Sequence, residues 1–129
     1  MKTTEPSKQF SITFEERINY LYAGVEAQTY NYEIVSGYCQ EIAAECKLSG
    51  HTKVLIEEDI AESISMVEAY EISTQVPQKF FAGIQIAFVD TFAEQNELNK
   101  FGEIVAVNTG VNGRMFSNVA AAELWLTGT

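Results

Sequence analysis

The residues best suited to chemistry lie in one acidic stretch between Val54 and Gln78, which contains no lysine, arginine or histidine. Carboxylates of this kind can ligate a divalent cation, work as a general acid and base, or steer a basic partner onto a surface. The stretch holds six of them: Glu57, Glu58, Asp59, Glu62, Glu68 and Glu71.

Four interpretations of this stretch stay open. The carboxylate spacing matches no EF-hand loop, and an acid–base pair needs two different environments that a sequence does not display. A solvated face that keeps an acidic protein soluble is the plain alternative to a docking surface. As the candidate partner-binding residues we take Glu58, Asp59, Glu62, Ser63 and Ser65.

Asp90 and Ser65 each have a simple structural interpretation beside a functional one. Asp90 ends an apolar strand and could join the acidic stretch in space, because the carboxyl ends of parallel strands meet at one edge. Its simpler role is that of a helix-start carboxylate before Thr91, which forms a capping-box spacing with Glu94. Ser65 and Glu68 repeat that spacing, so Ser65 is expected to cap a helix.

Two large apolar residues, Phe80 and Phe81, follow Pro77 in what we expect to be the connection between a helix and the next strand. They can mark a ligand or dimer surface, or they can fold over the sheet edge as ordinary packing. A pocket between sheet and helices that takes a small hydrophobic ligand is the alternative to protein docking.

Periodicity supplies the elements that must position these residues. Alternation in Phe10–Phe14 and Ile18–Tyr22 predicts a hairpin turning at Glu15–Arg17, and apolar runs at Val54–Ile56, Gly83–Val89 and Arg114–Phe116 predict further strands. Helical spacing predicts helices over 32–47, 65–75 (ended by Pro77), from Thr91, and over 118–126. This β-β-α-β-α-β-α-β-α order predicts a single α/β domain over 10–129, with a mostly parallel mixed sheet, behind a polar tail over 1–9.

Composition excludes several classes of function. The 129 residues carry a net charge of −10, which disfavours nucleic acid and anionic membranes as partners. Cys39 and Cys46 lie too far apart on one helix for a disulfide, and with one histidine and no C-x-x-C they predict no metal site. No signal-peptide pattern opens the chain, so we expect a cytoplasmic protein.

The last 17 residues carry a family resemblance. Gly113-Arg114-Met115-Phe116-Ser117-Asn118, followed by Ala121-Ala122-Glu123-Leu124-Trp125-Leu126, resembles the Arg-x-Phe … Ala-x-x-Trp-Leu ending of the SpoIIAA-like branch of STAS domains (sulfate-transporter and anti-sigma-factor-antagonist domains). The expected order of elements agrees with that family from about Phe10 to Leu126.

The resemblance implies a non-enzymatic regulatory module, without cofactor, that docks to a protein partner or holds a small ligand. In the better-understood relatives a serine at the start of the second helix is phosphorylated. The corresponding stretch here, 57–66, departs from their pattern, because no glycine follows Ser63 or Ser65 and Glu62 precedes Ser63. We therefore expect an interaction module that docks through 57–71 to an unknown partner, with a homodimer as a further possibility.

Overall fold

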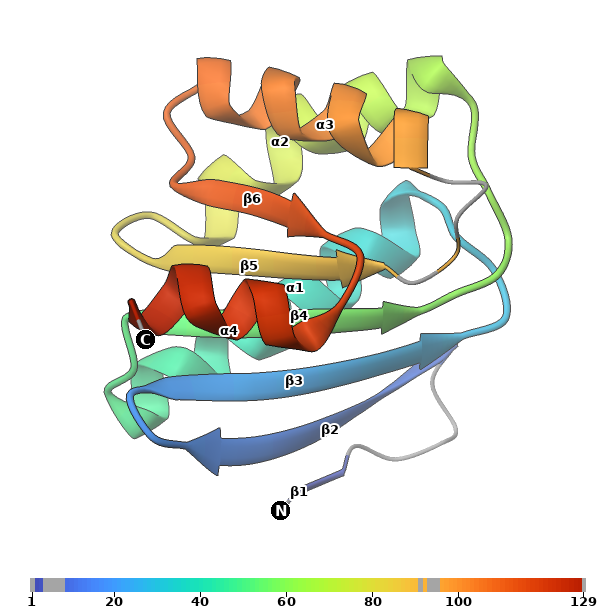
Figure 1. The fold of residues 1–129 in the computed structure, drawn as a ribbon. Coiled ribbons are helices and arrows are strands. Elements are labelled where there is room, and N and C mark those ends of the chain that lie inside the picture. Colours follow the sequence, from blue (N-terminus) through green and yellow to red (C-terminus); the bar gives the residue numbers. More distant parts are fainter. Residues whose placement is uncertain (1, 4–8, 91, 93–95, 129) are drawn as a thin grey trace.

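A six-stranded mixed sheet runs through the molecule, with its strands in chain order from one edge to the other (Figure 1). The computed structural model describes residues 2–3, 9–90, 92 and 96–128. The first two strand pairs are antiparallel and the remaining three are parallel. The strands are β1 (Lys2–Thr3), β2 (Phe10–Arg17), β3 (Tyr20–Ala27), β4 (Lys53–Asp59), β5 (Gln85–Asp90) and β6 (Gly113–Phe116). The prediction of an α/β domain with a mixed, mostly parallel sheet is confirmed.

The predicted hairpin forms, but its turn lies further along the chain than expected. Alternation continues through Arg17, which pairs with Tyr20, and the turn consists of Ile18 and Asn19. Asn19 takes the left-handed conformation with φ of 72°, which asparagine tolerates better than most residues. Part of the predicted tail also pairs, because β1 lies antiparallel to β2.

In the part of the chain that the structure describes, four helices connect or follow the parallel strands. Asn31 caps the first, since its side chain accepts a hydrogen bond from the Ile34 N–H at 2.9 Å. Gly50, at φ of 77°, ends the same helix in the left-handed conformation that glycine adopts without strain. The helices are α1 (Tyr32–Ser49), α2 (Met66–Phe80), α3 (Asn96–Asn108) and α4 (Val119–Thr127).

Helix α2 begins as predicted and ends later than predicted. Ser65 caps it by accepting a hydrogen bond from the Glu68 N–H at 3.1 Å. Pro77 does not end the helix, which continues to Phe80. Proline lacks the N–H that would bond the Ser73 carbonyl, and the Gln78 side-chain amide donates to that oxygen instead, at 2.8 Å.

Helices cover both faces of the sheet. One core packs α1 and α2 against the face that carries Ile12, Val54 and Ile86. A smaller core packs α4 against the opposite face through Leu55 and Leu126, and Figure 1 shows α4 in front of the strands with α1 and α2 behind them. Helix α3 packs on α2 and β6. Within the described residues no helix is both long and apolar enough to cross a membrane.

Candidate functional site

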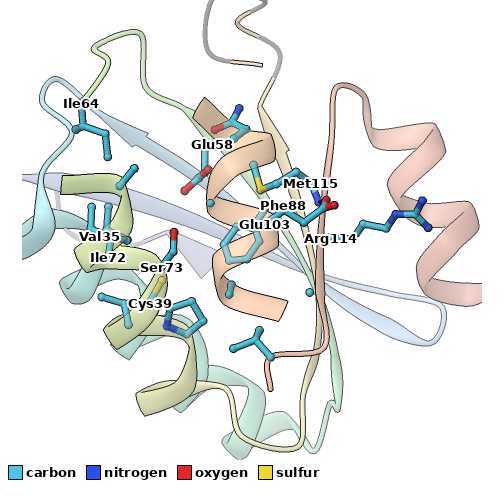
Figure 2. A pocket seen from close by; sticks show the side chains of 18 of the residues that line it. Val35, Cys39, Glu58, Ile64, Ile72, Ser73, Phe88, Glu103, Arg114 and Met115 are labelled. Carbon is cyan, nitrogen blue, oxygen red and sulfur yellow. Dashed lines mark hydrogen bonds between the residues drawn. The ribbon is translucent and has the colours of Figure 1, made fainter. Parts of the chain in front are cut away.

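A cavity lies between the sheet and α1, α2 and α3; it extends along β5 and β6 and has Glu58, near the carboxyl end of β4, in its wall (Figure 2). Its volume is about 80 Å³, roughly half of the ~150 Å³ of an engineered cavity that accepts benzene. Apolar side chains form most of the wall. They include Val35 of α1, Ile72 and Val76 of α2, Phe88 of β5 and Met115 of β6.

Glu58 supplies the buried carboxyl group of this cavity. It is 5% exposed, on the face of β4 that carries Val54 and Ile56, and it pairs in register with Asp90 on β5. Neighbouring strands lie about 4.8 Å apart, so the topology holds two carboxyl groups side by side in the interior. The expectation that Asp90 joins the acidic stretch in space is confirmed for Glu58.

Burial sets the protonation behaviour of Glu58. Loss of solvation raises its pKa to about 7, the hydrogen bond from the Tyr38 hydroxyl acts in the opposite direction, and the charge of Asp90 adds to the increase. The Tyr38 hydroxyl donates to Oε2, and among the hydrogen bonds between described residues none reaches Oε1. A carboxyl group with this pKa exchanges its proton near neutral pH.

Two tyrosines and a cysteine surround the carboxyl group on the helix side. Burial, and then the charge of Glu58, raises the pKa of Tyr38, of Tyr30 and of Cys39 well above the ordinary values. Both hydroxyls and the thiol therefore stay protonated. The high pKa means that Cys39 is an unreactive thiol rather than a nucleophile.

Asp90 is 2% exposed and has its hydrogen bonds satisfied by protein groups. Its Oδ1 accepts from the Phe92 N–H and its Oδ2 accepts from the Asn99 amide of α3, each at 3.0 Å. Because Asn99 lies in the first turn of α3 as described, Asp90 ties the end of β5 to the start of this helix. The Thr91 and Glu94 capping box lies outside the described residues.

The wall formed by α3 and β6 holds a second carboxylate, Glu103, which has a backbone N–H and a lysine as partners. Glu103 accepts a hydrogen bond from the Met115 N–H at 2.6 Å and lies 3.5 Å from the Lys100 ammonium. Arg114 belongs to the wall through its place on β6, but its side chain points away from the cavity in Figure 2. Its guanidinium lies 5.8 Å from the centre of the Phe116 ring.

The structure separates the residues that the sequence grouped as a docking surface. Glu58 is interior, so its predicted place on a partner-binding surface is wrong: the strand extends to Asp59 and turns Glu58 toward the helices. Asp59 and Ser63 are exposed, while Ser65 is the α2 cap. Glu62 accepts from the Tyr30 N–H at 3.3 Å, holding the loop that precedes α1.

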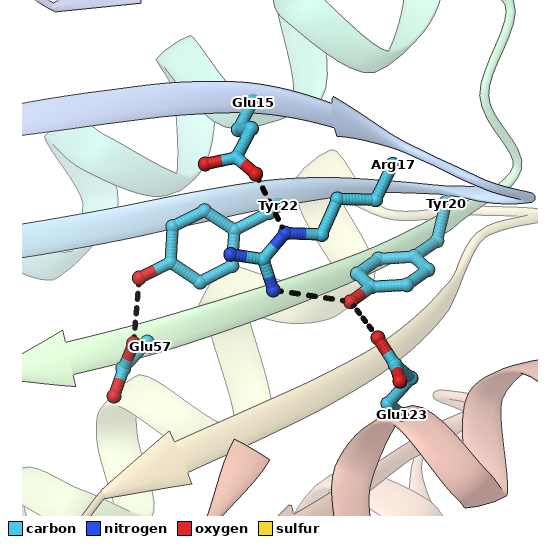
Figure 3. Close-up of polar contacts among 6 residues, drawn as sticks. All are labelled: Glu15, Arg17, Tyr20, Tyr22, Glu57 and Glu123. Carbon is cyan, nitrogen blue, oxygen red and sulfur yellow. Dashed lines mark hydrogen bonds and ion pairs between the residues drawn. The ribbon is translucent and has the colours of Figure 1, made fainter. Parts of the chain in front are cut away.

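Glu57 points to the opposite face of β4 and belongs to a second polar cluster (Figure 3). The Tyr22 hydroxyl donates to it at 2.6 Å, and burial with that bond raises the pKa of Tyr22 to about 12. Arg17 lies with its guanidinium 4.1 Å from the Tyr22 ring centre and donates to the Tyr20 hydroxyl at 3.2 Å. Tyr20 donates in turn to Glu123 at 2.5 Å, so this cluster fastens α4 to the sheet.

Phe80 and Phe81 do not form the loop surface that the sequence suggested. Phe80 is the last residue of α2 and packs partly buried against the larger core, and Phe81 is 3% exposed. Phe81 is therefore an interior side chain rather than part of an exposed loop, because the helix continues past Pro77. The alternative of ordinary packing fits both residues.

Sequence reasoning missed the polar residues that α1 and its preceding loop bring to Glu58. Tyr30, Tyr38 and the cavity-lining Ser73 were not among the predicted site residues. One signal was available: Tyr38 shares a helical face with Val35 and Cys39, so its hydroxyl had to find a polar partner in the interior.

Among the described residues no group of three or more histidine, cysteine, aspartate or glutamate side chains is placed to hold a metal ion. Cys39 and Cys46 are buried free thiols on α1. Comparison with models of known protein families gave no match. Comparison with curated proteins gave no match either.

Proposed function

We propose that this chain is a non-enzymatic binding module that takes a small, mainly apolar ligand into the cavity between α1, α2, α3 and the sheet. The observation that carries this proposal is the cavity itself, with an apolar wall and one buried carboxyl group. Concave, largely apolar sites with few polar groups are typical of small-ligand binding, and open α/β sheets bind at the carboxyl ends of their strands.

The volume limits the part of the ligand that can be enclosed. In proportion to the benzene-sized cavity above, a cavity of about 80 Å³ accommodates about three heavy atoms. Three helices and the sheet line this space, and the rest of a ligand can extend toward its open side. A butyl-sized probe therefore fills the cavity with part of its chain and is suited to a test.

The test uses butan-1-ol titrated into isotopically labelled protein, with backbone amide shifts as the readout. We expect saturable shifts at α1, α2 and α3 around the cavity, and at least a tenfold loss of affinity in the variant Ala106→Leu, which fills the space from α3. Val107→Leu is the matched control, because Val107 is half exposed on the same helix and does not line the cavity.

Equal affinity in the wild type and Ala106→Leu, with Val107→Leu also unchanged, would mean that butanol binds elsewhere. Absence of saturable binding to the wild type would likewise contradict the proposal. Circular dichroism of both variants establishes that the comparison is between folded proteins.

A second candidate is the regulatory docking that the STAS resemblance implies. One observation favours it: Met66, Val67 and Tyr70 at the start of α2 are 58%, 70% and 54% exposed, beside the exposed Asp59 and Ser63. Apolar side chains grouped on a surface commonly mark a protein contact. The order of elements from β2 onward also agrees with the resemblance.

Photo-crosslinking distinguishes a surface that docks a protein partner from a surface that is merely exposed. A photoreactive residue at Val67 should yield a defined adduct in cells that express the protein, and the same residue at Leu48 should not. Leu48 is 81% exposed on α1, so it controls for exposure alone. Identical adduct patterns from both positions would count against docking through α2.

A further inference from the structure

We infer that the cavity recognises a small protonated amine, with the ammonium group held by Glu58 and a short apolar body enclosed by α1, α2 and α3. This inference rests on the proposed binding function and names the chemical class of its ligand. Among the groups that shift the pKa of the buried Glu58 carboxyl group, Tyr38 and Asp90, neither is a cation.

Glu58 is more than nine-tenths buried, lines the cavity, and keeps Oε1 without a hydrogen bond from another described residue. Among the described residues the fully buried side-chain oxygen without a hydrogen-bond partner is Gln78 Oε1, so Glu58 Oε1 stays reachable from the cavity. Figure 2 shows Glu58 among the side chains that line the cavity. A ligand that carries a donor would complete this set of contacts.

The surrounding charges select a cation over other donors. Asp90 lies beside Glu58 on the next strand, and Glu103 stands in the opposite wall. Lys100, 3.5 Å from Glu103, offsets part of that carboxylate's charge, and Arg114 lies by the Phe116 ring with its side chain directed away from the cavity, so the negative charge comes mainly from Glu58 and Asp90. The electrostatic potential of the cavity is therefore negative, which favours an ammonium group and disfavours a carboxylate.

A metal cation fits this arrangement less well than an organic one. The described residues contain no group of three side chains able to ligate a metal ion, and most of the wall is apolar. An ammonium group needs few acceptors, and the adjoining carbon chain gains from the contact with Val35, Ile72 and Val76. The cavity volume suits about three carbons of such a chain, and the remainder can extend toward the open side.

The protonation of Glu58 gives this recognition a pH signature. The titratable groups that face Glu58 are Tyr30 before α1, Tyr38 and Cys39 on α1, Asp90 on β5, and Glu103 on α3; α2 presents Ile72 and Ser73, which do not titrate. The tyrosines and the thiol stay protonated. An ammonium group binds the ionised form, so affinity must rise with pH through the pKa of Glu58, at about 7.

The experiment compares three probes with the same four-carbon body: n-butylamine, butan-1-ol and butyrate. At pH 8 we expect butylammonium to bind about tenfold more tightly than butanol, as a charge-assisted hydrogen bond implies, and butyrate to bind more weakly than either. Between pH 8 and pH 6 the affinity for butylammonium should fall about tenfold, while that for butanol stays constant.

Glu58→Gln tests the residue, because glutamine keeps the size and a hydrogen-bonding oxygen for Tyr38 but cannot ionise. The variant should bind butylammonium and butanol equally at every pH from 6 to 8. Asp59→Asn is the matched control: it removes one carboxylate from the next, exposed position and should leave the preference for the amine unchanged.

The outcomes distinguish this inference from the proposed function. If butanol binds in the cavity as well as the amine does, or if Glu58→Gln retains the amine preference, the inference is overturned and the binding function stands. If Ala106→Leu lowers the affinity for none of the three probes, the inference and the proposed binding function are both overturned. A preference for butyrate would also overturn the inference, since it would require a positive cavity.

Discussion

Glu58 is the residue on which most of the interior chemistry depends. A buried carboxyl group loses the solvation of its charged form, and the fold responds by raising its pKa rather than by supplying a cation. Because the folded pKa lies above the ordinary value of 4.5, the folded protein binds a proton more tightly at this site than the unfolded chain does. This difference links stability to pH.

The sign of the linkage is definite. The stabilisation associated with the neutral form is fully present below the unfolded pKa of about 4.5 and is lost as pH rises through about 7. In the wild type we expect this group alone to lower the free energy of unfolding by about 2–3 kcal/mol between pH 5 and pH 8. Urea denaturation at the two pH values measures the change.

Glu58→Gln should remove that pH dependence and make the protein more stable than the wild type at pH 8. Asp59→Asn changes the net charge equally at an exposed position and should keep the wild-type slope. A wild-type slope in Glu58→Gln would mean that other groups determine the pH response.

At the scale of single residues, the sequence predicted that Asp90 lies near the acidic stretch but not that Glu58 is buried. The pairing of Asp90 with the acidic stretch followed from parallel strands that end at one edge. The burial of Glu58 did not follow, because the apolar run stops at Ile56 and the sequence alone does not tell how far helices cover the strand beyond it. Adjacent carboxylates Glu57 and Glu58 thus reach opposite faces, one with Tyr22 and one with Tyr38.

Helix α2 shows how single side chains define an element. Its first turn depends on the Ser65 hydroxyl, which accepts the Glu68 N–H, and Glu68 in turn accepts the Tyr32 N–H of α1 at 3.1 Å. One end of α2 is thereby joined to the start of α1. Since α2 forms a wall of the cavity, this joint contributes to the shape of the site.

Ser65→Ala should lower the free energy of unfolding by about 1 kcal/mol, because an N-cap hydrogen bond is lost. Ser63→Ala is the matched control: the same change at an exposed serine two residues earlier should stay within about 0.5 kcal/mol of the wild type. Thermal or urea unfolding of both variants makes the comparison. Equal losses in the two variants would contradict the assignment of Ser65 as the cap.

The sequence predicted the elements better than their ends. Ser65 was recognised as the start of α2 because capping chemistry is local. The end of α2 was placed too early. The Gln78 side chain donates to the Ser73 carbonyl in place of the N–H that Pro77 lacks, and a contact of a single side chain does not show in the periodicity. The turn of the hairpin was misplaced for a related reason: Asn19 adopts its left-handed conformation without the glycine that usually marks such a turn.

At the scale of the whole molecule, alternation of strands and helices was sufficient to predict the class of fold. It was not sufficient to predict the distribution of helices, with α1, α2 and α3 enclosing a cavity on one face and α4 on the other. The cavity arises where three helices and a strand edge fail to fill the space between them. Such a volume depends on the packing of side chains distant in sequence, so no single motif could have indicated it.

The hydrogen bond between Glu103 and the Met115 N–H has a consequence beyond the cavity wall. β6 is the last strand of the sheet, and an edge strand offers its free amides to the backbone of any other extended chain. At Met115 that position is occupied by a carboxylate of the same molecule. A second chain that sought to extend the sheet there would have to displace Glu103 and approach its negative charge, so the same side chain that walls the cavity also protects this edge against aggregation.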